Sequence, residues 1–576
     1  MITDFLYFRE QQQLFLFDWN YIAETVSQPG GLAILTSRFL VQFFHSGTAA
    51  VIIAIILVLS IAAAIYGTIR NTSRCRSLFG IPLSCVTAIL LLMSISDVSL
   101  HFDSFTALLI AAATGYIHSA IGFKSKVAMT ATAILETVIT WFLAGPASLI
   151  FALTALITDL RRNDGALAFL YPATAGILAV SGYLCTANGE LTRMFTPAFF
   201  YEVTAPMPLI HLLSWLSVPL IVAFASICRK HLVGWMLSVI SLSAAVLSFI
   251  SYSGRSEMRY EKEYDKMALL AANEQWKELA DFSRRHLTNY QASNYHNLAQ
   301  AQMGMLAENL FKVPQGGPAS LIHISGEHAA DICLAHVLYA CGNMAGAQNI
   351  AFNALQTGCG YNPTLFKMLA KIELMRGSYE VAEKYINILG KSHYYKAWAE
   401  RYRAFLWNDS MVENDPELGN GRRDLPISEG FVNDRSPMDE LLRIIESNPS
   451  DRKAMEYALS YLLLAKDFIT AYSFIKDFYG TPGLSTLPTP AQEALIFFSD
   501  YYNTQTEEYA LSHGLTKEQF DEYRQVDLDW CREHGVEEDT IQRFASFKEA
   551  YGRNRGGNVP SGYGDTWWHY MLYTKI

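Results

Sequence analysis

Long apolar runs alternate with short polar stretches over residues 47–251. A membrane-spanning helix needs about 20 predominantly apolar residues, and eight of these runs approach or reach that length. The fifth run is short, so a tilted or re-entrant segment is an alternative there, and the count is open by one between residues 127 and 190. The pattern predicts about eight transmembrane helices, at 48–69, 79–95, 105–123, 127–143, 148–160, 166–186, 209–228 and 232–251.

Residues 257–576 show helical periodicity and almost no alternation of the kind that strands have. Small residues recur there at a spacing of 35, Gly342 with Gly377 and Ala347 with Ala382. Weaker copies of the same pattern lie at 273–280 and at 448–471. The pattern predicts helices flanking the two glycine turns, at 329–341, 345–356, 363–376 and 379–389.

This pattern resembles the tetratricopeptide repeat, in which helix pairs recur every 34 residues and hide their apolar faces against the next pair. The resemblance implies an α-solenoid with a concave groove for a peptide or protein partner, and the partner-binding candidates are Gly342, Tyr379 and Trp398. The predicted fold class is therefore all-α, a polytopic transmembrane bundle followed by a tetratricopeptide-like α-solenoid.

Two segments interrupt the predicted repeats. Residues 408–437 are rich in Asn, Asp, Gly and Pro and are predicted to form a long loop. Residues 562–573 are dense in Trp and Tyr. Such a tail fits as a plug for the last helix pair, or alternatively as a segment that folds back onto the bilayer surface or the first extracytoplasmic loop, because these side chains concentrate at membrane interfaces.

Charge divides the chain at the same place as hydropathy. Residues 1–255 hold 13 Lys and Arg against 11 Asp and Glu, whereas the remaining residues hold 31 against 43. A charge content of 17% over the whole chain is below that of an ordinary soluble protein. Lys and Arg (44) are fewer than Asp and Glu (54), which excludes a polybasic nucleic-acid binder. We predict an amphipathic segment at 1–46, a transmembrane domain at 47–251 and a helical repeat domain at 252–576.

The basic residues indicate the orientation in the membrane. Nine of the 13 in residues 1–255 follow the first, third, fifth and seventh spans, and the positive-inside rule assigns that side to the cytoplasm. The segment 1–46 and the acidic domain 252–576 are then extracytoplasmic, and we expect a multi-pass protein of a bacterial inner membrane with a periplasmic C-terminal domain. The nine are Arg70, Arg74, Arg76, Lys124, Lys126, Arg161, Arg162, Arg229 and Lys230.

Residues 1–8 read like the end of a longer element, so we expect a further hydrophobic span upstream of Met1. Residues 9–45 are amphipathic and aromatic on both sides of the breaker Pro29-Gly30-Gly31. One interpretation is a pair of helices that lie in the membrane interface.

The other interpretation of residues 9–45 rests on resemblance. An acidic residue and Gln at the start of a long first extracytoplasmic loop, with two helices and a Gly-rich break, resemble the first loop of GT-C-type glycosyltransferases. That family takes sugars from polyprenyl-phosphate donors, and the resemblance implies Glu10, or as second choice Asp18, as base or metal ligand. It places a second acidic motif at Asp97 and Asp103, which are alternatively helix caps. A divalent metal is implied only by this interpretation, and otherwise no cofactor is evident.

Glu136 lies alone inside the fourth predicted span. A carboxylate at that depth needs a partner or a wet cavity, so it is predicted to bind a cation, relay protons or be satisfied by a neighbouring Thr or Tyr. His118 and His211 are predicted to be helix-face residues rather than ligands. Because inverted halves and further intramembrane carboxylates are not apparent, transport ranks below the other functions.

The whole chain resembles an uncharacterised bacterial family of polytopic inner-membrane proteins with a C-terminal tetratricopeptide-like domain. The leading hypothesis is a membrane protein that presents a periplasmic repeat domain for protein–protein interaction or envelope assembly, and the alternative is a GT-C-like glycosyltransferase that binds a lipid-linked sugar. Membrane lipid is a partner in either case, and nucleic acid is not. The resemblance is carried by residues 8–11 and 29–31, by Asn448-Pro449 and by residues 564–567.

Overall fold

The computed structural model consists of helices, and no strand occurs among the residues it describes. Two compact units divide the chain. Unit 1 comprises Met1–Lys266, Leu355–Thr364 and Asn387–Glu400, and unit 2 comprises Met267–Ala354, Leu365–Ile386 and Arg401–Ile576. The structure describes residues 2–73, 78–97, 100–121, 125–162, 165–185, 191–196, 208–228, 230–253, 256–357, 361–425, 437–512, 514–553 and 562–575.

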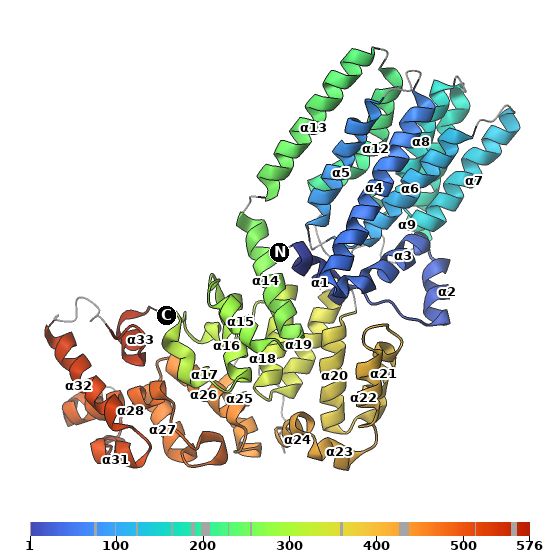
Figure 1. Cartoon of the computed structure of the whole chain (residues 1–576). Coiled ribbons are helices and arrows are strands. Elements are labelled where there is room, and N and C mark those ends of the chain that lie inside the picture. The colour runs from blue at the N-terminus through green and yellow to red at the C-terminus, as the bar shows by residue number, and fades with distance from the viewer. Residues whose placement is uncertain are drawn as a thin grey trace. The chain divides into compact units, whose positions relative to one another are not determined.

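The long helices of unit 1 run side by side, and shorter helices gather at one end of them (Figure 1). The short N-terminal ones are α1 (Ile2–Gln12), α2 (Trp19–Ser27), α3 (Gly31–Val41) and η1 (Gln42–His45). The others are α4 (Gly47–Thr72), α5 (Gly80–Ile95), α6 (Asp103–Ala120), α7 (Lys126–Ala144), α8 (Ala147–Arg161), η2 (Gly165–Phe169), α9 (Leu170–Cys185), α10 (Leu191–Phe195), α12 (Leu209–Ile227) and α13 (His231–Ser253).

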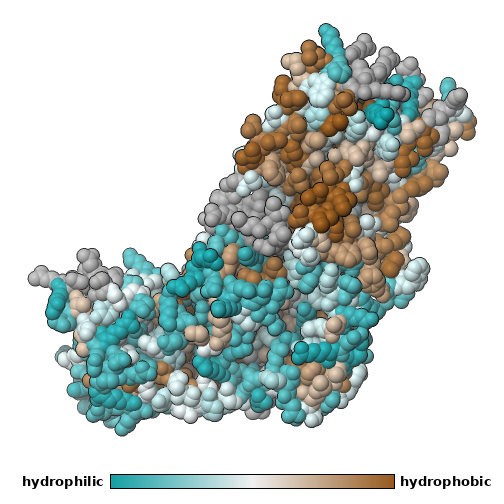
Figure 2. All heavy atoms as spheres, in the orientation of Figure 1, coloured by the Kyte–Doolittle hydropathy of each residue, from teal (hydrophilic) through white to brown (hydrophobic). Residues whose placement is uncertain are grey.

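Five helical segments in the described part of the chain are long and apolar enough to cross a membrane: α4, α7, Leu167–Cys185, α12 and α13. All five coincide with predicted spans. Figure 2 shows hydrophobic residues over much of the visible face of these helices. Unit 1 therefore has the composition of a membrane protein.

The other three predicted spans are helical but less suited to a bilayer. α5 is apolar but only 16 residues long. α8 has 15 residues and therefore a length of about 22 Å, less than the hydrocarbon thickness of about 30 Å. α6 carries Asp103 and His118 near its two ends, which lower its mean hydropathy. The count of eight spans thus remains a prediction.

Small residues bring the helices of unit 1 close together, which is the usual way that membrane helices pack. A Cβ atom at Gly67 of α4 would lie 2.5 Å from the ring of Tyr116 on α6. A Cβ atom at Gly115 of α6 would lie 3.3 Å from the side chain of Thr154 on α8. α6 is therefore packed closely on two sides.

The breaker Pro29-Gly30-Gly31 separates α2 from α3, as the sequence predicts. Gly30 has a φ of 74°, in the left-handed region that glycine adopts without strain. Its N–H donates to the carbonyl of Trp141, one turn before the end of α7. This contact fixes the α2–α3 turn at the terminus of a long apolar helix.

The helices from residue 256 onward are shorter and belong mostly to unit 2. In chain order, helices from the N-terminal boundary of unit 2 onward are α14 (Ser256–Ala272), α15 (Trp276–Ser283), α16 (Tyr290–Gln302), α17 (Leu306–Asn309), η3 (Leu310–Lys312), η4 (Pro318–Ser320), α18 (His328–Ala340), α19 (Met344–Thr357), α20 (Pro363–Arg376), α21 (Tyr379–Gly390), α22 (Lys396–Arg403), α23 (Asp409–Asn414) and α24 (Pro416–Arg423). They continue with α25 (Pro437–Ser447), α26 (Arg452–Leu464), α27 (Phe468–Phe478), η5 (Pro482–Leu484), α28 (Thr489–Thr504), α29 (Glu507–Ser512), α30 (Lys517–Arg524), α31 (Leu528–Glu533), α32 (Glu538–Arg553) and α33 (Trp567–Tyr573). Of these helices, α14 and α19 to α22 each lie partly in unit 1.

Five turns of unit 2 share one backbone geometry. In each, a residue with positive φ stands two residues before the next helix, and the following N–H donates to the carbonyl five residues before it. This is the pattern of a Schellman helix end. The five residues with positive φ are Glu274, Gly304, Gly342, Gly377 and Lys466.

The recurring turn explains both the repeat pattern and its weakness. Gly342 and Gly377 are the glycines that the sequence pattern detected. Glu274 and Lys466 adopt the same left-handed conformation at φ 56° and 59° without being glycine, so those copies look degenerate in sequence. The turn at Gly304 was not predicted, because Gly304 lies 38 residues before Gly342 rather than 35.

The segment 408–437 was predicted to be one long loop, and this prediction was wrong for its first half. α23 and α24 occupy Asp409–Asn414 and Pro416–Arg423. The Asp, Asn and Pro residues that suggested a loop are helix starts, since Asn408 and Asp415 cap α23 and α24 through their side chains. Residues 426–436 lie outside the described residues.

The aromatic C-terminus docks within unit 2. Trp567 and Trp568 are fully buried, and their indole N–H groups donate to the carbonyls of Leu463 and Glu493 at 3.0 and 2.7 Å. Tyr570 donates its hydroxyl to the carbonyl of Leu464. The side chains that suggested a membrane tail thus pack against α26 and α28, in agreement with the plug interpretation. The visible face of unit 2 is mainly hydrophilic (Figure 2).

Candidate functional site

Glu10, the main catalytic candidate, is buried at the end of α1. Its carboxylate accepts a hydrogen bond from the Tyr395 hydroxyl at 2.7 Å and another from the Gln11 amide at 2.6 Å. The oxygen of Gln11 accepts in turn from Thr364 at 2.5 Å. Burial, and then the charge of Glu10, raise the pKa of Tyr395 well above its ordinary value, so this phenol is held as a proton donor.

Arg9 lies beside Glu10 and is only 1% exposed. One guanidinium nitrogen donates to the carbonyls of Ile95 and Asp97, at 2.8 and 2.6 Å. The guanidinium also lies 5.6 Å from the centre of the Phe105 ring. These contacts fasten α1 to the end of α5 and the start of α6. They also involve Asp97 through its backbone, whereas the prediction concerned its carboxylate.

Asp103 is the first residue of α6 and is 2% exposed. Its carboxylate accepts a hydrogen bond from Gln13 at 3.0 Å. Arg38 of α3 donates to the Tyr21 hydroxyl at 3.1 Å. Burial alone would lower the pKa of Arg38, but the charge of Asp103, followed by Tyr21, outweighs it and raises the pKa. The field of Asp103 therefore reaches a second arginine, the half-buried Arg38.

We call this set of side chains the α1 cluster. It unites residues from α1 and the segment after it, from α3, from the start of α6 and from the distant segment 387–400. Its two carboxylates, the Arg9 guanidinium and the Tyr395 phenol are buried, and Arg38 is half-buried. The members are Arg9, Glu10, Gln11, Gln13, Arg38, Asp103 and Tyr395.

Asp18 does not belong to the α1 cluster. It caps the N-terminus of α2 by accepting from the Tyr21 N–H, and it pairs with Lys391 at 2.7 Å. The Lys391 side chain and then the Tyr21 N–H lower the pKa of Asp18. Both contacts are those of a structural residue, so the geometry favours Glu10 over the second choice.

Two residues of α12 border the α1 cluster: His211, which was predicted to be a helix-face residue, and Trp215, which the sequence pattern did not single out. His211 contacts Ser94 at 2.7 Å, and its ring lies 5.2 Å from the ring of Phe105, which also contacts Arg9. Trp215 follows one turn later. In the described part of the chain, neither Nε2 of His211 nor Nε1 of Trp215 has a hydrogen-bond partner, although both side chains are buried. Such polar atoms are free to meet a ligand or water.

Glu136 has a partner that the sequence did not indicate. Its carboxylate lies 2.8 Å from Nδ1 of His118, and Nε2 of the same imidazole lies 3.2 Å from Asp159. The three residues come from α7, α6 and α8, and we call them the membrane triad. His118, predicted to be an ordinary helix-face residue, is its centre.

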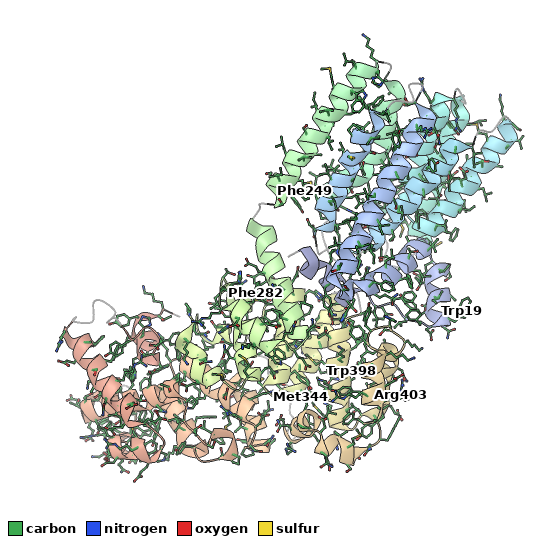
Figure 3. The ribbon with its side chains drawn as sticks, viewed as in Figure 1. Trp19, Phe249, Phe282, Met344, Trp398 and Arg403 are labelled. Atoms are coloured by element: carbon green, nitrogen blue, oxygen red, sulfur yellow. The ribbon has the colours of Figure 1, made fainter. Side chains whose placement is uncertain are left out.

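The three partner-binding candidates have different surroundings. Gly342 is buried in a turn, where a Cβ atom would lie 3.0 Å from Ile444, so its own role is to allow the close approach. The hydroxyl of Tyr379 donates to Asp409 at 2.6 Å. Trp398, labelled in Figure 3, lies in α22 and belongs to unit 1.

The α1 cluster does not fit a divalent metal. The carboxylates of Glu10 and Asp103 are engaged by different donors, Tyr395 with Gln11 in one case and Gln13 in the other. Within the described residues, no group of three or more His, Cys, Asp and Glu is placed to hold a metal ion.

Comparison with known proteins gives one finding. Neither a curated protein nor a solved structure matches the chain. The match to a family covers residues 1–574, essentially the full length, so unit 1 and unit 2 occur together as one family architecture. The chain belongs to a family of unknown function (DUF6057).

Proposed function

We propose that this protein is a membrane-bound glycosyltransferase that takes a sugar from a polyprenyl-phosphate donor, with the α1 cluster as its active site. The observation that carries the proposal is the burial of Glu10, Asp103 and Arg9 at one end of the apolar helices, with the half-buried Arg38 in the field of Asp103. Buried ionisable groups are costly and concentrate at functional sites.

The chemistry of the cluster suits such a reaction. The arginines supply positive charge for the phosphate of a donor, since guanidinium groups bind phosphate oxygens well. A carboxylate such as Glu10 supplies the base that removes a proton from the hydroxyl of an acceptor. Tyr395 orients that carboxylate through its hydroxyl.

The proposed location of the site is the extracytoplasmic face of a bacterial inner membrane. The ends of α4, α7 and α8 that bear Arg70, Lys126 and Arg161 point away from α1 to α3 (Figure 1). If these basic ends are cytoplasmic, the α1 cluster faces the side on which lipid-linked sugars are used by the GT-C-type enzymes that residues 9–45 resemble.

The test compares variants in a host strain that lacks the native gene. Glu10→Gln and Asp103→Asn keep the size of each side chain but remove the charge, and we expect both to lose the same surface glycan as the deletion. Asp18→Asn still caps α2 and is the matched control, with membrane levels measured for all variants. A Glu10→Gln strain with the wild-type glycan profile would contradict the proposal, as would a deletion without any glycan change.

A second proposed function belongs to unit 2, and the five Schellman turns support it. Turns of one geometry between successive helices fit a tetratricopeptide-like solenoid, and such solenoids hold peptides or proteins. We propose that unit 2 binds a protein partner in the periplasm. A photo-reactive residue at Tyr379 should crosslink one discrete partner in cells, and the same residue at the exposed Leu528 should not. Equal crosslinking at both positions would refute this role.

A further inference from the structure

We propose that the membrane triad, His118 with Glu136 and Asp159, is a proton-binding site inside unit 1, distinct from the α1 cluster. The two ring nitrogens of His118 contact carboxylate oxygens on two different helices, at 2.8 and 3.2 Å. The ligand of this site is one exchangeable proton, held on the imidazole between the two carboxylates.

The number of protons follows from the contacts. An ionised carboxylate only accepts hydrogen bonds, so each ring nitrogen that faces one must carry a proton. A neutral imidazole carries one proton and satisfies one contact, leaving a nitrogen lone pair against an oxygen. The triad therefore requires one proton more than a neutral histidine with two carboxylates.

The charges around the membrane triad favour the bound proton. Arg162 lies 3.7 Å from Asp159, and its guanidinium also donates to the carbonyls of Ser119 and Ile121 at the end of α6. With the proton bound, two positive groups face two negative groups. Without it, the group has a net negative charge among apolar helices, which is unfavourable.

Apart from these charged groups, the neighbours of His118 are aromatic or uncharged. Phe151 of α8 and Tyr171 of α9 pack against the imidazole with ring centres at 6.1 and 5.2 Å. The groups that face it with charge or a titratable proton are thus Glu136, Asp159, Arg162 and Tyr171. On the α4 side the neighbouring contact is uncharged, between Asn71 and Ser119.

Glu136 is the most exposed member of the membrane triad. The side chain of His118 is fully buried and that of Asp159 is 4% exposed, whereas that of Glu136 is 24% exposed. Glu136 is thus the member of the triad that reaches the surface of the helix bundle. Because the bound proton connects α6, α7 and α8, the packing of these helices depends on it.

The test is nitrogen-15 NMR of histidine-labelled full-length protein in lipid nanodiscs at pH 7. The His118 signals are those missing from His118→Gln, or, if that variant does not fold, those shifted by Glu136→Gln. We expect both ring nitrogens of His118 to be protonated in the wild type and only one in the Glu136→Gln, Asp159→Asn double variant.

The matched control is Glu24→Gln, on exposed helix α2, which should leave the His118 signals unchanged. A single protonated ring nitrogen in the wild type would overturn the proposal. So would two protonated nitrogens that persist in the double variant, because the carboxylates would then not be what holds the proton.

Discussion

At the scale of single residues, the sequence could indicate which side chains were unusual but not what they touch. Glu10 was singled out, whereas its partner Tyr395 lies 385 positions away and carries no local signal. Glu136 was expected to need a partner, and the structure supplies His118 from the preceding helix. Hydropathy patterns report burial along one element, and such pairings depend on how different elements meet.

Tyr395→Phe tests the main contact of Glu10. Removing the hydroxyl leaves a buried carboxylate with one hydrogen bond fewer, which should lower the free energy of unfolding by about 1–3 kcal/mol. Thermal unfolding of the detergent-solubilised protein measures it. Tyr394→Phe is the control, since that side chain is 37% exposed, and an equal effect of both changes would refute the assigned contact.

The buried carboxyl group of Glu493 should make the stability of unit 2 depend on pH. Burial raises its pKa to about 8, although the Trp567 N–H that it accepts opposes the shift. Because the folded state holds this proton more tightly than the unfolded state, the stability from Glu493 is full below pH 4.5 and is lost as the pH rises through about 8.

We therefore expect the free energy of unfolding of unit 2 to fall between pH 5 and pH 9, by at most about 1.4 kcal/mol per pH unit from this group, and its unfolding temperature to fall with it. Glu493→Gln imitates the protonated form and should flatten the profile, whereas the exposed Glu549→Gln should not. A wild-type profile without any decline, or one unchanged by Glu493→Gln, would contradict this account.

At the scale of elements, local sequence patterns predicted the helices correctly where one helix follows another directly. Helices predicted at 329–341 and 379–389 correspond to α18 and α21, because apolar periodicity and glycine turns are local properties. The loop predicted at 408–437 failed because Asp and Asn favour both loops and helix caps, and only the capped N–H groups at Asn408 and Asp415 decide between them.

The α2–α3 turn should be intolerant of a side chain. A Cβ atom at Gly31 would lie 2.1 Å from the carbonyl oxygen of Thr25, so Gly31→Ala should cost about 1–3 kcal/mol of stability. Gly176→Ala in α9 is the control, because nothing lies within 4 Å of its Cβ. Limited proteolysis and thermal unfolding measure both, and a harmless Gly31→Ala would disprove the turn.

The docked C-terminal helix α33 should matter for stability. Trp568 is fully buried and packs against Phe544 and Phe547 with ring centres at 5.0 and 5.4 Å. Trp568→Ala should destabilise unit 2 by about 3–5 kcal/mol. Trp407 is 60% exposed, so Trp407→Ala should have a much smaller effect in the same denaturant series. Similar losses for the two tryptophans would mean that α33 is not docked as described.

At the scale of the whole molecule, the change in hydropathy and charge near residue 252 marks where the apolar helices end, since α13 ends at Ser253. It does not mark the full extent of unit 1, which also takes in Leu355–Thr364 and Asn387–Glu400. Those segments supply Thr364, Lys391 and Tyr395 to the N-terminal region. Because these segments are polar and lie in the second half of the chain, hydropathy and charge do not show that they belong to unit 1.

The most direct test of the proposed activity uses purified protein in liposomes that contain a radiolabelled hexose on polyprenyl phosphate. Transfer of the label from the lipid phase to water or to an acceptor is measured for the wild type, Glu10→Gln and Asp18→Asn. We predict transfer by the wild type and by Asp18→Asn, and at least a hundredfold loss in Glu10→Gln, on the order of a general base's contribution. Wild-type transfer by Glu10→Gln, or no transfer by the wild type, would contradict the account.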